Sequence, residues 1–527
     1  MVNSVWKNAV YNNILSLILL YLFVFSAGCK SYHRNNTHPE ITDADIRKGE
    51  SLSISYCQGC HSLPDPSLLD SKHWEETLLP NMGPRLGIFN HNFKAYPSSI
   101  HDRNLVKNFY PSQPLLSPED WQYLMDFYIA TSPDSLPGQH RKTAIKEGLS
   151  LFEIHTPQTK YYGPATCLVQ IDTTDNKHSI LLGDATRKQI FRFNSNLQSE
   201  DSILVTGPVV GLDFQRRYMV ACDIGVLNPN NGRFGKGLAI SSGTDNKMKV
   251  DSIPLFDALA RPVQLTAVDL NNDGFTDFLA CEFGFLTGSL SWFENKGGKN
   301  FQRHVIRPVP GAIKAYVQDY NHDGLPDLWV LFAQGDEGIF LFTNQGKGKF
   351  TERKVLGFPP IYGSSYFELD DFNHDGFPDI LYTCGDNADY SEVLKPYHGV
   401  YIFLNDGHNN FTQKYFFPIN GCFKAMARDF DGDGDLDIAT ISYFPDFANQ
   451  PEEGFVYLEN KGNFEFQPLT IPEGKLGRWL TMDVGDLNGD GKIDIVLGNF
   501  SIGPTFIKSA VQWKQGPPFL FLKNIGK

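Results

Sequence analysis

The sequence has few of the features of nucleic-acid-binding or disulfide-rich proteins. Basic residues are outnumbered, with 46 Lys and Arg against 60 Asp and Glu, and the net charge of −14 argues against nucleic acid as a partner. Cysteine is scarce, with 8 among 527 residues. Five of these cysteines stand singly, mostly inside apolar stretches, and are expected to be buried core thiols rather than a disulfide set: Cys167, Cys222, Cys281, Cys384 and Cys422.

A long membrane-spanning run is also missing from the N-terminal region. The apolar stretch from Ile14 to Phe25 is too short for a comfortable spanning helix and is typical of a signal-peptide core. It ends at Ser26-Ala27-Gly28-Cys29, which resembles the lipobox of bacterial lipoproteins, although Ser26 stands where Leu is usual. The resemblance implies that Cys29 is lipidated and anchors the chain to a membrane; the alternative is a plain secretory signal. Either way we expect export to the cell envelope, on the periplasmic side or at the outer-membrane surface.

Turn-forming residues are abundant, with 47 Gly and 32 Pro in a chain long enough for two or three units. A Pro/Ser/Gly-rich stretch from Thr131 to Gly138 indicates a domain boundary. We therefore expect a multidomain chain in which a small all-α domain precedes an all-β domain. The expected boundaries are 1–28 for the signal peptide, 29–40 for a tether, 41–135 for the helical domain, 136–162 for a linker and 163–527 for the β domain.

The helical domain carries a haem-attachment motif. A helix capped by Thr42 is expected to run to Tyr56 and to end on Cys57-Gln58-Gly59-Cys60-His61. Two thiols at this spacing can bond covalently to both vinyl groups of a haem, while the adjacent imidazole binds the iron. A zinc pair would need two further ligands, and a redox Cys-x-x-Cys would not need His61. The motif predicts one haem c, attached at Cys57 and Cys60, with His61 as an axial ligand.

Met82 is the expected second axial ligand, because a thioether in the Gly/Pro-rich stretch 81–87 suits that position. The alternatives are Met125, His73, His91 and His101. Met125 belongs to a helix that Ser117 should start, where it shares a core-facing stripe with Trp121. First helix, Cys-x-x-Cys-His, Met stretch and last helix in this order resemble the class I cytochrome c domain, over about 90 residues. The resemblance implies electron transfer but does not specify the redox partner, a protein or a quinone.

The motif Asp-x-Asn/Asp-x-Asp-Gly-x-x-Asp occurs five times, about every 55 residues. Oxygen atoms at positions 1, 3, 5 and 9 can converge on a hard cation, and Gly at position 6 permits the sharp turn between them. Mg²⁺ fits poorly in so protein-rich a shell, so about five Ca²⁺ ions are expected. The expected ligands are Asp269, Asn271, Asp273, Asp277, Asp319, Asn321, Asp323, Asp327, Asp371, Asn373, Asp375, Asp379, Asp429, Asp431, Asp433, Asp437, Asp486, Asn488, Asp490 and Asp494.

Two other interpretations of the motif fit the sequence less well. A single copy could be an ordinary Asp-Gly turn, but five regular copies favour a repeated site. An EF-hand would need flanking helices and Glu at position 12, whereas the flanks here are strand-like, as in 266–268 and 495–497. The sequence therefore predicts calcium loops between β-strands.

Each loop is followed by an apolar strand that ends in Asn or Lys and then Gly, as in 342–346. A repeat of about 55 residues with four strands predicts a propeller blade. Two further repeats without the full loop, at 169–184 and 211–223, bring the expected number to seven. The pattern resembles the FG-GAP/VCBS repeat family, whose calcium-loop propellers also occur in integrin head domains. The resemblance covers 163–527 and implies a seven-bladed β-propeller.

Alignment of the blades predicts a ring of polar side chains at the channel mouth. Its members are Asp184, Asp223, Glu282, Asp386 and Asn499, with Lys314 and Lys424 on the strand before the loop. Such a mixed ring could hold a glycan or a small polar ligand. In the alternative interpretation the acids face solvent and the lysines merely neutralise them.

Three functions follow from these features. The first is electron transfer by a membrane-anchored c-type cytochrome whose propeller binds a partner or ligand. The second is a dehydrogenase whose propeller oxidises a sugar or alcohol and reduces the attached haem, which depends on fold analogy alone because no cofactor signature or catalytic His/Asp pair is visible. The third is an adhesion or glycan-binding propeller. Reduction of the haem by a substrate would distinguish the second, and glycan retention without reduction would distinguish the third.

Overall fold

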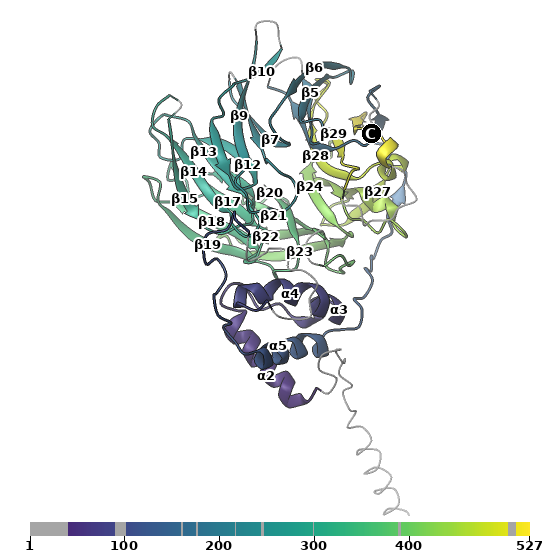
Figure 1. The fold of residues 1–527 in the computed structure, drawn as a ribbon. Helices are drawn as coiled ribbons and strands as arrows, with labels where there is room; N and C mark the ends of the chain where they lie inside the picture. Colours follow the sequence, from purple (N-terminus) through teal and green to yellow (C-terminus); the bar gives the residue numbers. More distant parts are fainter. Residues whose placement is uncertain are drawn as a thin grey trace, which may run out of the picture.

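The computed structural model describes residues 41–89, 102–159, 162–174, 178–216, 218–243, 247–298, 300–387, 391–503 and 513–526. Within them a small helical region precedes a ring of β-sheets (Figure 1). No helix in these ranges is long and apolar enough to cross a membrane. The expected signal peptide, tether and lipidated Cys29 lie outside the described residues, as do His91 and His101.

Two helices of 14 residues frame the helical region, α2 (Asp43–Tyr56) and α5 (Pro118–Thr131). Both begin as predicted, because the Thr42 side chain accepts a hydrogen bond from the Asp45 amide and Ser117 accepts one from the Asp120 amide. Short helical turns lie between them: η1 (Pro66–Leu68), α3 (Ser71–His73), the π-helical η2 (Trp74–Leu78), α4 (Leu79–Met82) and η3 (Gly83–Leu86).

The core of this region forms where α2 packs on α5. The two backbones meet at Gly49, where an added Cβ would lie only 2.0 Å from the carbonyl oxygen of Tyr123. Trp121 and Tyr128 of α5 are 1% exposed, and the ring centroid of Tyr128 lies 4.3 Å from that of Trp74. The predicted core-facing stripe of α5 is thus confirmed.

Seven sheets follow in the described residues, each with an inner, a second, a third and an outer strand. Blade 1 contains β3 (Thr166–Asp172), β4 (Ser179–Asp184), β5 (Gln189–Asn194) and β6 (Ser199–Leu204). Blade 2 contains β7 (Val209–Phe214), β8 (Tyr218–Asp223), β9 (Gly235–Ser242), β10 (Met248–Val250) and β11 (Phe256–Leu259). Blade 3 contains β12 (Pro262–Val268), β13 (Asp277–Glu282), β14 (Ser289–Asn295) and β15 (Phe301–Arg307). Blade 4 contains β16 (Ala312–Gln318), β17 (Asp327–Phe332), β18 (Gly338–Asn344) and β19 (Phe350–Gly357).

The remaining blades include strands from before residue 163. Blade 5 contains β20 (Ser364–Asp370), β21 (Asp379–Cys384), β22 (Gly399–Asn405) and β23 (Phe411–Pro418). Blade 6 contains β24 (Cys422–Arg428), β25 (Asp437–Ser442), β26 (Phe455–Asn460), β27 (Phe466–Thr470) and the two-residue β1 (Lys146–Glu147). Blade 7 contains β28 (Trp479–Gly485), β29 (Asp494–Asn499), β30 (Phe519–Asn524) and β2 (Phe152–His155).

The sheets close into a ring, because each inner strand contacts the next and β28 contacts β3. The predicted seven-bladed β-propeller is therefore confirmed as the fold of the β domain. The expected linker 136–162 needs correction, because β2 pairs antiparallel with β30 and supplies the outer strand of blade 7. The four-residue β2 was missed because its partner lies at the other end of the chain.

The helical region rests on one end of the propeller (Figure 1). Each calcium motif precedes a second strand, whereas the loops that contact the helical region follow the second strands of blades 2 and 5. In blade 5, Val393 follows the second strand and packs against the apolar cluster that contains Trp74 and Trp121. In blade 2, the Asn231 amide donates to the Asp102 carboxylate over 2.9 Å. The two candidate centres therefore lie on opposite sides of the ring.

Candidate functional site

The Cys-x-x-Cys-His motif lies directly after α2, as predicted. Cys57 caps the helix, and the Cys60 amide donates to the Cys57 carbonyl over 3.4 Å, so the segment between the two thiols is a tight turn. The Cys57 side chain packs against the helical core, while Cys60 is exposed. The Nδ1 atom of His61 lies 2.8 Å from the Ser62 carbonyl. A proton on Nδ1 would leave Nε2 with a free lone pair, the form in which imidazole binds a metal.

The alternative interpretations of the motif gain no support from the described residues. Burial, with a smaller contribution from Cys60, raises the pKa of Cys57 to about 11, whereas a redox-active thiol has a lowered pKa. Within the described ranges, the only close grouping of three metal-binding side chains lies in the propeller, not beside His61. The donor set Cys57, Cys60 and His61 fits a covalently attached haem, and no described residue completes a zinc site.

The candidates for the second axial ligand lie in different settings. Met82 is half-buried at the end of α4. The expected irregular loop is helical, because Pro80 stands in the first turn of α4, where proline is tolerated, and η3 continues to Leu86. Met125 is 1% exposed inside α5, and both Nδ1 contacts of His73 go to Asp70 at 2.8 Å. Among the candidates that the structure describes, Met82 is thus the one whose side chain is not already committed to the core or to an ion pair.

The first calcium motif forms a compact loop around its own carboxylates. Asp269 accepts hydrogen bonds from the Asp273 amide at 3.1 Å and the Gly274 amide at 2.8 Å. Asn271 accepts a second bond from the Asp273 amide at 3.1 Å. These bonds fold the side chains at positions 1, 3 and 5 toward one another, and the same bonds recur in the other four loops.

Two positions of every loop adopt the left-handed backbone conformation. Position 6 is glycine each time, with φ between 82° and 95°, and an added Cβ would meet no atom within 4 Å. The positive φ, and not a lack of room for a side chain, therefore requires glycine at position 6. Position 4 is also left-handed, and the sequence analysis missed it: Asn272, His322, His374, Gly432 and Gly489. Asn and Gly tolerate this conformation best, which was the available signal.

The aspartate at position 9 ties each loop to its sheet. Asp277 is the first residue of β13 and is fully buried. One of its oxygens accepts from the Leu270 amide at 3.1 Å, and the other from the Asn295 amide at 2.8 Å. Burial raises the pKa of the equivalent carboxyls, to about 6 for Asp379 and Asp494 and about 7 for Asp437. A nearby cation would oppose this shift, because it favours the ionised carboxylate.

The fourth loop has the densest donor set. Asp429, Asp431 and Asp433 each place a carboxylate oxygen within 4.8 Å of the others. Three acidic oxygens so close repel one another unless a cation lies between them, and oxygen-rich sets of this kind suit Ca²⁺. The geometry of the loops therefore fits calcium, with the fourth loop as the strongest candidate.

Comparisons with known proteins address these repeats. A family model described as "FG-GAP-like repeat" matches residues 269–330 and 319–382, which carry the first three calcium loops. These are FG-GAP repeats. Integrin alpha-PS5 of Drosophila melanogaster is 35% identical over 105 residues, which cover 17% of this chain and 9% of that relative. The chain thus spans less than a tenth of the length of this relative.

The solved structures that the comparison matches are distant from this chain in sequence. Saccharomyces cerevisiae Sqt1 has a TM-score of 0.43 at 10% identity, covering 70% of this chain and 98% of its own. BBS1N in complex with ARL6DN has a TM-score of 0.42 at 10% identity, covering 72% and 98%. The description of the FG-GAP propeller therefore depends on its own sheets and loops.

The members of the expected polar ring in the FG-GAP propeller are already bonded to other residues of the chain. Asp184 pairs with Arg187 at 2.7 Å, and Asn499 accepts from the Arg478 amide at 3.0 Å. Glu282 is fully buried between Arg233 and Arg303, at 3.1 and 2.6 Å. Each of these residues is the last residue of the second strand of its blade, as the alignment predicted.

Two members of the ring require separate comment. Asp223 ends β8 and accepts bonds from the Gly225 amide, at 2.8 Å, and from the Thr206 hydroxyl. Asp386 lies two residues beyond the end of β21 at Cys384, so it is not equivalent to the others. The alignment by residue type was misled there because Asp386 is the first acidic residue after that strand.

Lys314 and Lys424 lie on the inner strands β16 and β24 rather than with these acids. The Nζ atom of Lys314 lies 5.5 Å from the ring centroid of Tyr366, and that of Lys424 lies 4.8 Å from the same ring. Lys424 also donates to the Met482 carbonyl over 2.7 Å. Burial, together with the charge of Lys424, lowers the pKa of Lys314 to about 8. The lysines are part of the interior of the FG-GAP propeller, and the structure does not bring them together with the acids as one ring.

Carboxylates that join neighbouring blades were missed in the sequence. Asp213, Glu368 and Asp483 each accept a hydrogen bond from a backbone amide of the next inner strand, at 3.2, 2.9 and 2.8 Å. All three occupy the fifth position of their own inner strands. An acidic residue recurs at that position of several inner strands, and this recurrence is the sequence signal that could have indicated the role.

Proposed function

We propose that the chain is an exported, membrane-anchored c-type cytochrome that carries out electron transfer, with its calcium-stabilised FG-GAP propeller as the partner- or ligand-binding module. The observation that carries this proposal is the Cys57–Cys60 turn at the end of α2, followed by His61 with Nδ1 against the Ser62 carbonyl. The anchor would be the lipid on Cys29, and the redox partner would be a protein or a quinone.

The helical region has a clear division of roles in this proposal. Cys57 and Cys60 would hold the haem by thioether bonds, and the Nε2 atom of His61 would bind the iron. Met82 would supply the second axial ligand as a neutral thioether, which favours the reduced form of the iron. The bound haem would supply reversible one-electron oxidation and reduction. The core around Trp121 and Tyr128 excludes water beside this site and keeps the two helices fixed.

The propeller would contribute stability and a docking surface. Five calcium loops, with ligands at positions 1, 3, 5 and 9, would each fix one connection between an inner and a second strand. Those loops lie on the side of the ring away from the helical region, so calcium would stabilise the propeller without taking part in electron transfer. An acidic protein of this charge would not engage nucleic acid.

Covalent haem attachment is the decisive test. The full chain, produced in cells with a c-type haem maturation system, should retain haem after denaturing electrophoresis and show one haem per chain in an alkaline pyridine spectrum. A variant with Cys57→Ser and Cys60→Ser should lose that haem, whereas Cys222→Ser, which changes a buried propeller thiol, should keep it. A wild-type chain without covalent haem under these conditions would refute the proposal.

A further inference from the structure

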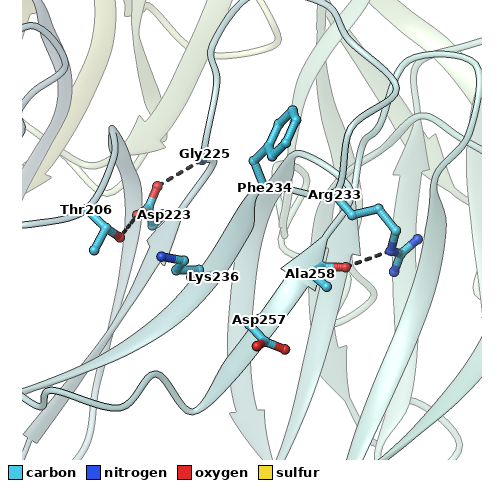
Figure 2. Close-up of a pocket in the computed structure, with 8 residues that line it drawn as sticks. All are labelled: Thr206, Asp223, Gly225, Arg233, Phe234, Lys236, Asp257 and Ala258. Atoms are coloured by element: carbon cyan, nitrogen blue, oxygen red, sulfur yellow. Dashed lines mark hydrogen bonds between the residues drawn. The ribbon is translucent and has the colours of Figure 1, made fainter. Parts of the chain in front are cut away.

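A cleft at one end of blade 2 belongs to neither the haem motif nor the calcium loops. Its volume is about 470 Å³, within the usual size of small-molecule sites. It lies where the connection from blade 1 meets the ends of β8, β9 and β11 (Figure 2). The lining residues are Thr206, Asp223, Gly225, Arg233, Phe234, Lys236, Asp257 and Ala258.

Phe234 supplies an exposed aromatic surface at this cleft. The residue is 54% exposed, so much of its side chain is open to solvent. An added Cβ at Gly232 would lie 2.0 Å from Cε2 of Phe234, and one at Gly225 would lie 2.6 Å from its carbonyl carbon. Only glycine leaves room for the ring and its backbone at these two positions. The ring is thus held against the backbone while much of it remains open to a ligand.

Two charged side chains of the wall are fixed by the chain itself. Asp223 is 1% exposed and is held by the Gly225 amide and the Thr206 hydroxyl. The Nε atom of Arg233 donates to the Ala258 carbonyl over 2.7 Å, and its Nη2 donates to Glu282 over 3.1 Å. Ala258 has φ of 53°, a left-handed conformation that is costly for alanine and is stabilised here by its contact with Arg233.

Two other charged side chains remain free for a ligand. Among the described residues, the side chains of Lys236 and Asp257 make neither a hydrogen bond nor an ion pair. Figure 2 shows Lys236 between Asp223 and Asp257, with its ammonium group on the side of Asp223 and Thr206. One free cation and one free anion give the cleft no net preference for a charged ligand.

These groups together select a chemical class. A hydroxyl group can accept a hydrogen bond from an ammonium group and donate one to a carboxylate, so adjacent hydroxyls satisfy Lys236 and Asp257 at once. The C–H face of a sugar ring is apolar and packs on an aromatic ring such as Phe234. We propose that this cleft binds a neutral saccharide, with Phe234 as the stacking surface and with Lys236 and Asp257 as the hydroxyl-binding groups.

The proposal concerns the ligand of the FG-GAP propeller and is independent of the haem. Covalent haem is measured by staining and spectroscopy, whereas saccharide binding is measured on the same full chain by saturation-transfer NMR and calorimetry. A chain without covalent haem could still bind a saccharide, and a chain that binds no saccharide could still carry haem. Failure of one proposal is therefore distinguishable from failure of the other.

The test uses the calcium-loaded full chain and a panel of neutral probes: glucose, galactose, mannose, N-acetylglucosamine, lactose and maltose. At least one should bind with a millimolar or lower dissociation constant. Phe234→Leu should weaken that binding about tenfold, and Lys236→Met and Asp257→Asn each about fivefold. Tyr162→Leu, at an aromatic residue that is 76% exposed and outside the cleft, should leave binding unchanged.

Three results would overturn the proposal. These are the absence of binding to every probe, binding that Phe234→Leu and Lys236→Met both leave unchanged, or binding only of a charged probe such as glutamate or lysine. The melting temperature of each variant shows whether that variant is folded. Because Phe234 and Asp257 are exposed, at least one variant of the cleft should keep the wild-type melting temperature.

Discussion

The hydroxyl group of Tyr397, in the propeller, donates a hydrogen bond of 3.1 Å to the carbonyl of Leu68, in the helical region. The Tyr397 ring also stacks on Tyr362, with centroids 4.5 Å apart, while Ile361 and Val393 pack into the helical core. The helical region is therefore docked on blade 5 rather than carried on a loose tether.

Removal of this hydroxyl should loosen the docked region. Tyr397→Phe leaves the Leu68 carbonyl without this partner and should cost about 1 kcal/mol. Amide hydrogen exchange should become faster in residues 66–73 and stay unchanged in blades 1 to 3. Tyr415→Phe is the matched control, because no described residue hydrogen-bonds the Tyr415 hydroxyl. Equal exchange in Tyr397→Phe and wild type would show that this contact does not hold the two parts together.

Calcium removal should act on the propeller alone. A chelator should lower the melting temperature of the propeller and leave the haem spectrum nearly intact, because the loops lie on the far side of the ring. Metal analysis should find about five Ca²⁺ in the wild-type chain and about one fewer in Asp429→Ala. Asp435→Asn changes a carboxylate of the same loop outside positions 1, 3, 5 and 9 and should keep all the ions. An unchanged melting curve in excess chelator would contradict structural calcium.

Lys314 should make stability depend on alkaline pH. Its pKa is lowered to about 8 in the folded protein from an ordinary value of 10.5, so between these values the unfolded chain binds more protons. Stability should therefore rise as pH increases from 8 to 10.5, and the cost of burying the charge is fully present below pH 8. Lys314→Met should remove this rise and should stabilise the protein by about 2 to 3 kcal/mol at pH 7.

The control for this prediction is Lys349→Met, which changes an exposed lysine of blade 4. It should alter neither the stability at pH 7 nor its alkaline rise. A Lys314→Met variant that is less stable than wild type at pH 7 would mean that the buried ammonium is a net stabiliser through Tyr316 and Tyr366.

Met82→Ala tests the second axial ligand. If Met82 binds the haem iron, the oxidised wild-type protein should show a weak near-infrared band from the Met-to-iron bond, and Met82→Ala should abolish it. Met125→Leu preserves the volume of a core residue and should keep the band. Survival of the band in Met82→Ala would assign the position to another residue.

The sequence predicted those features whose causes are local. The five loops were found because the ligands, the glycine and the flanking strands all lie within a dozen residues, and the helix caps at Thr42 and Ser117 are equally short-range signals. Repetition then gave the number of blades, since each unit buries its apolar face only against a neighbour.

Features that depend on distant parts of the chain were missed or misplaced. The role of Glu368 was hidden because its partner is a backbone amide at Ala427, which no residue type reveals. The cleft beside Phe234 is assembled from two connections and from residues of β8, β9 and β11, so no spacing in the sequence indicates it. Asp386 was misaligned because loops between strands vary in length more freely than strands do.

The pairing of β2 with β30 also sets an order of events during synthesis. Phe152 finds its partner, Asn524, only after the residues of β30 have been synthesised. Until then β2 is an unpaired strand, on which another chain could pair. Because β2 lies just downstream of the helical region, a haem attached early would be bound before the ring of blades is complete. A cell that makes this protein should therefore benefit from chaperones that shield β2 until β30 has been made.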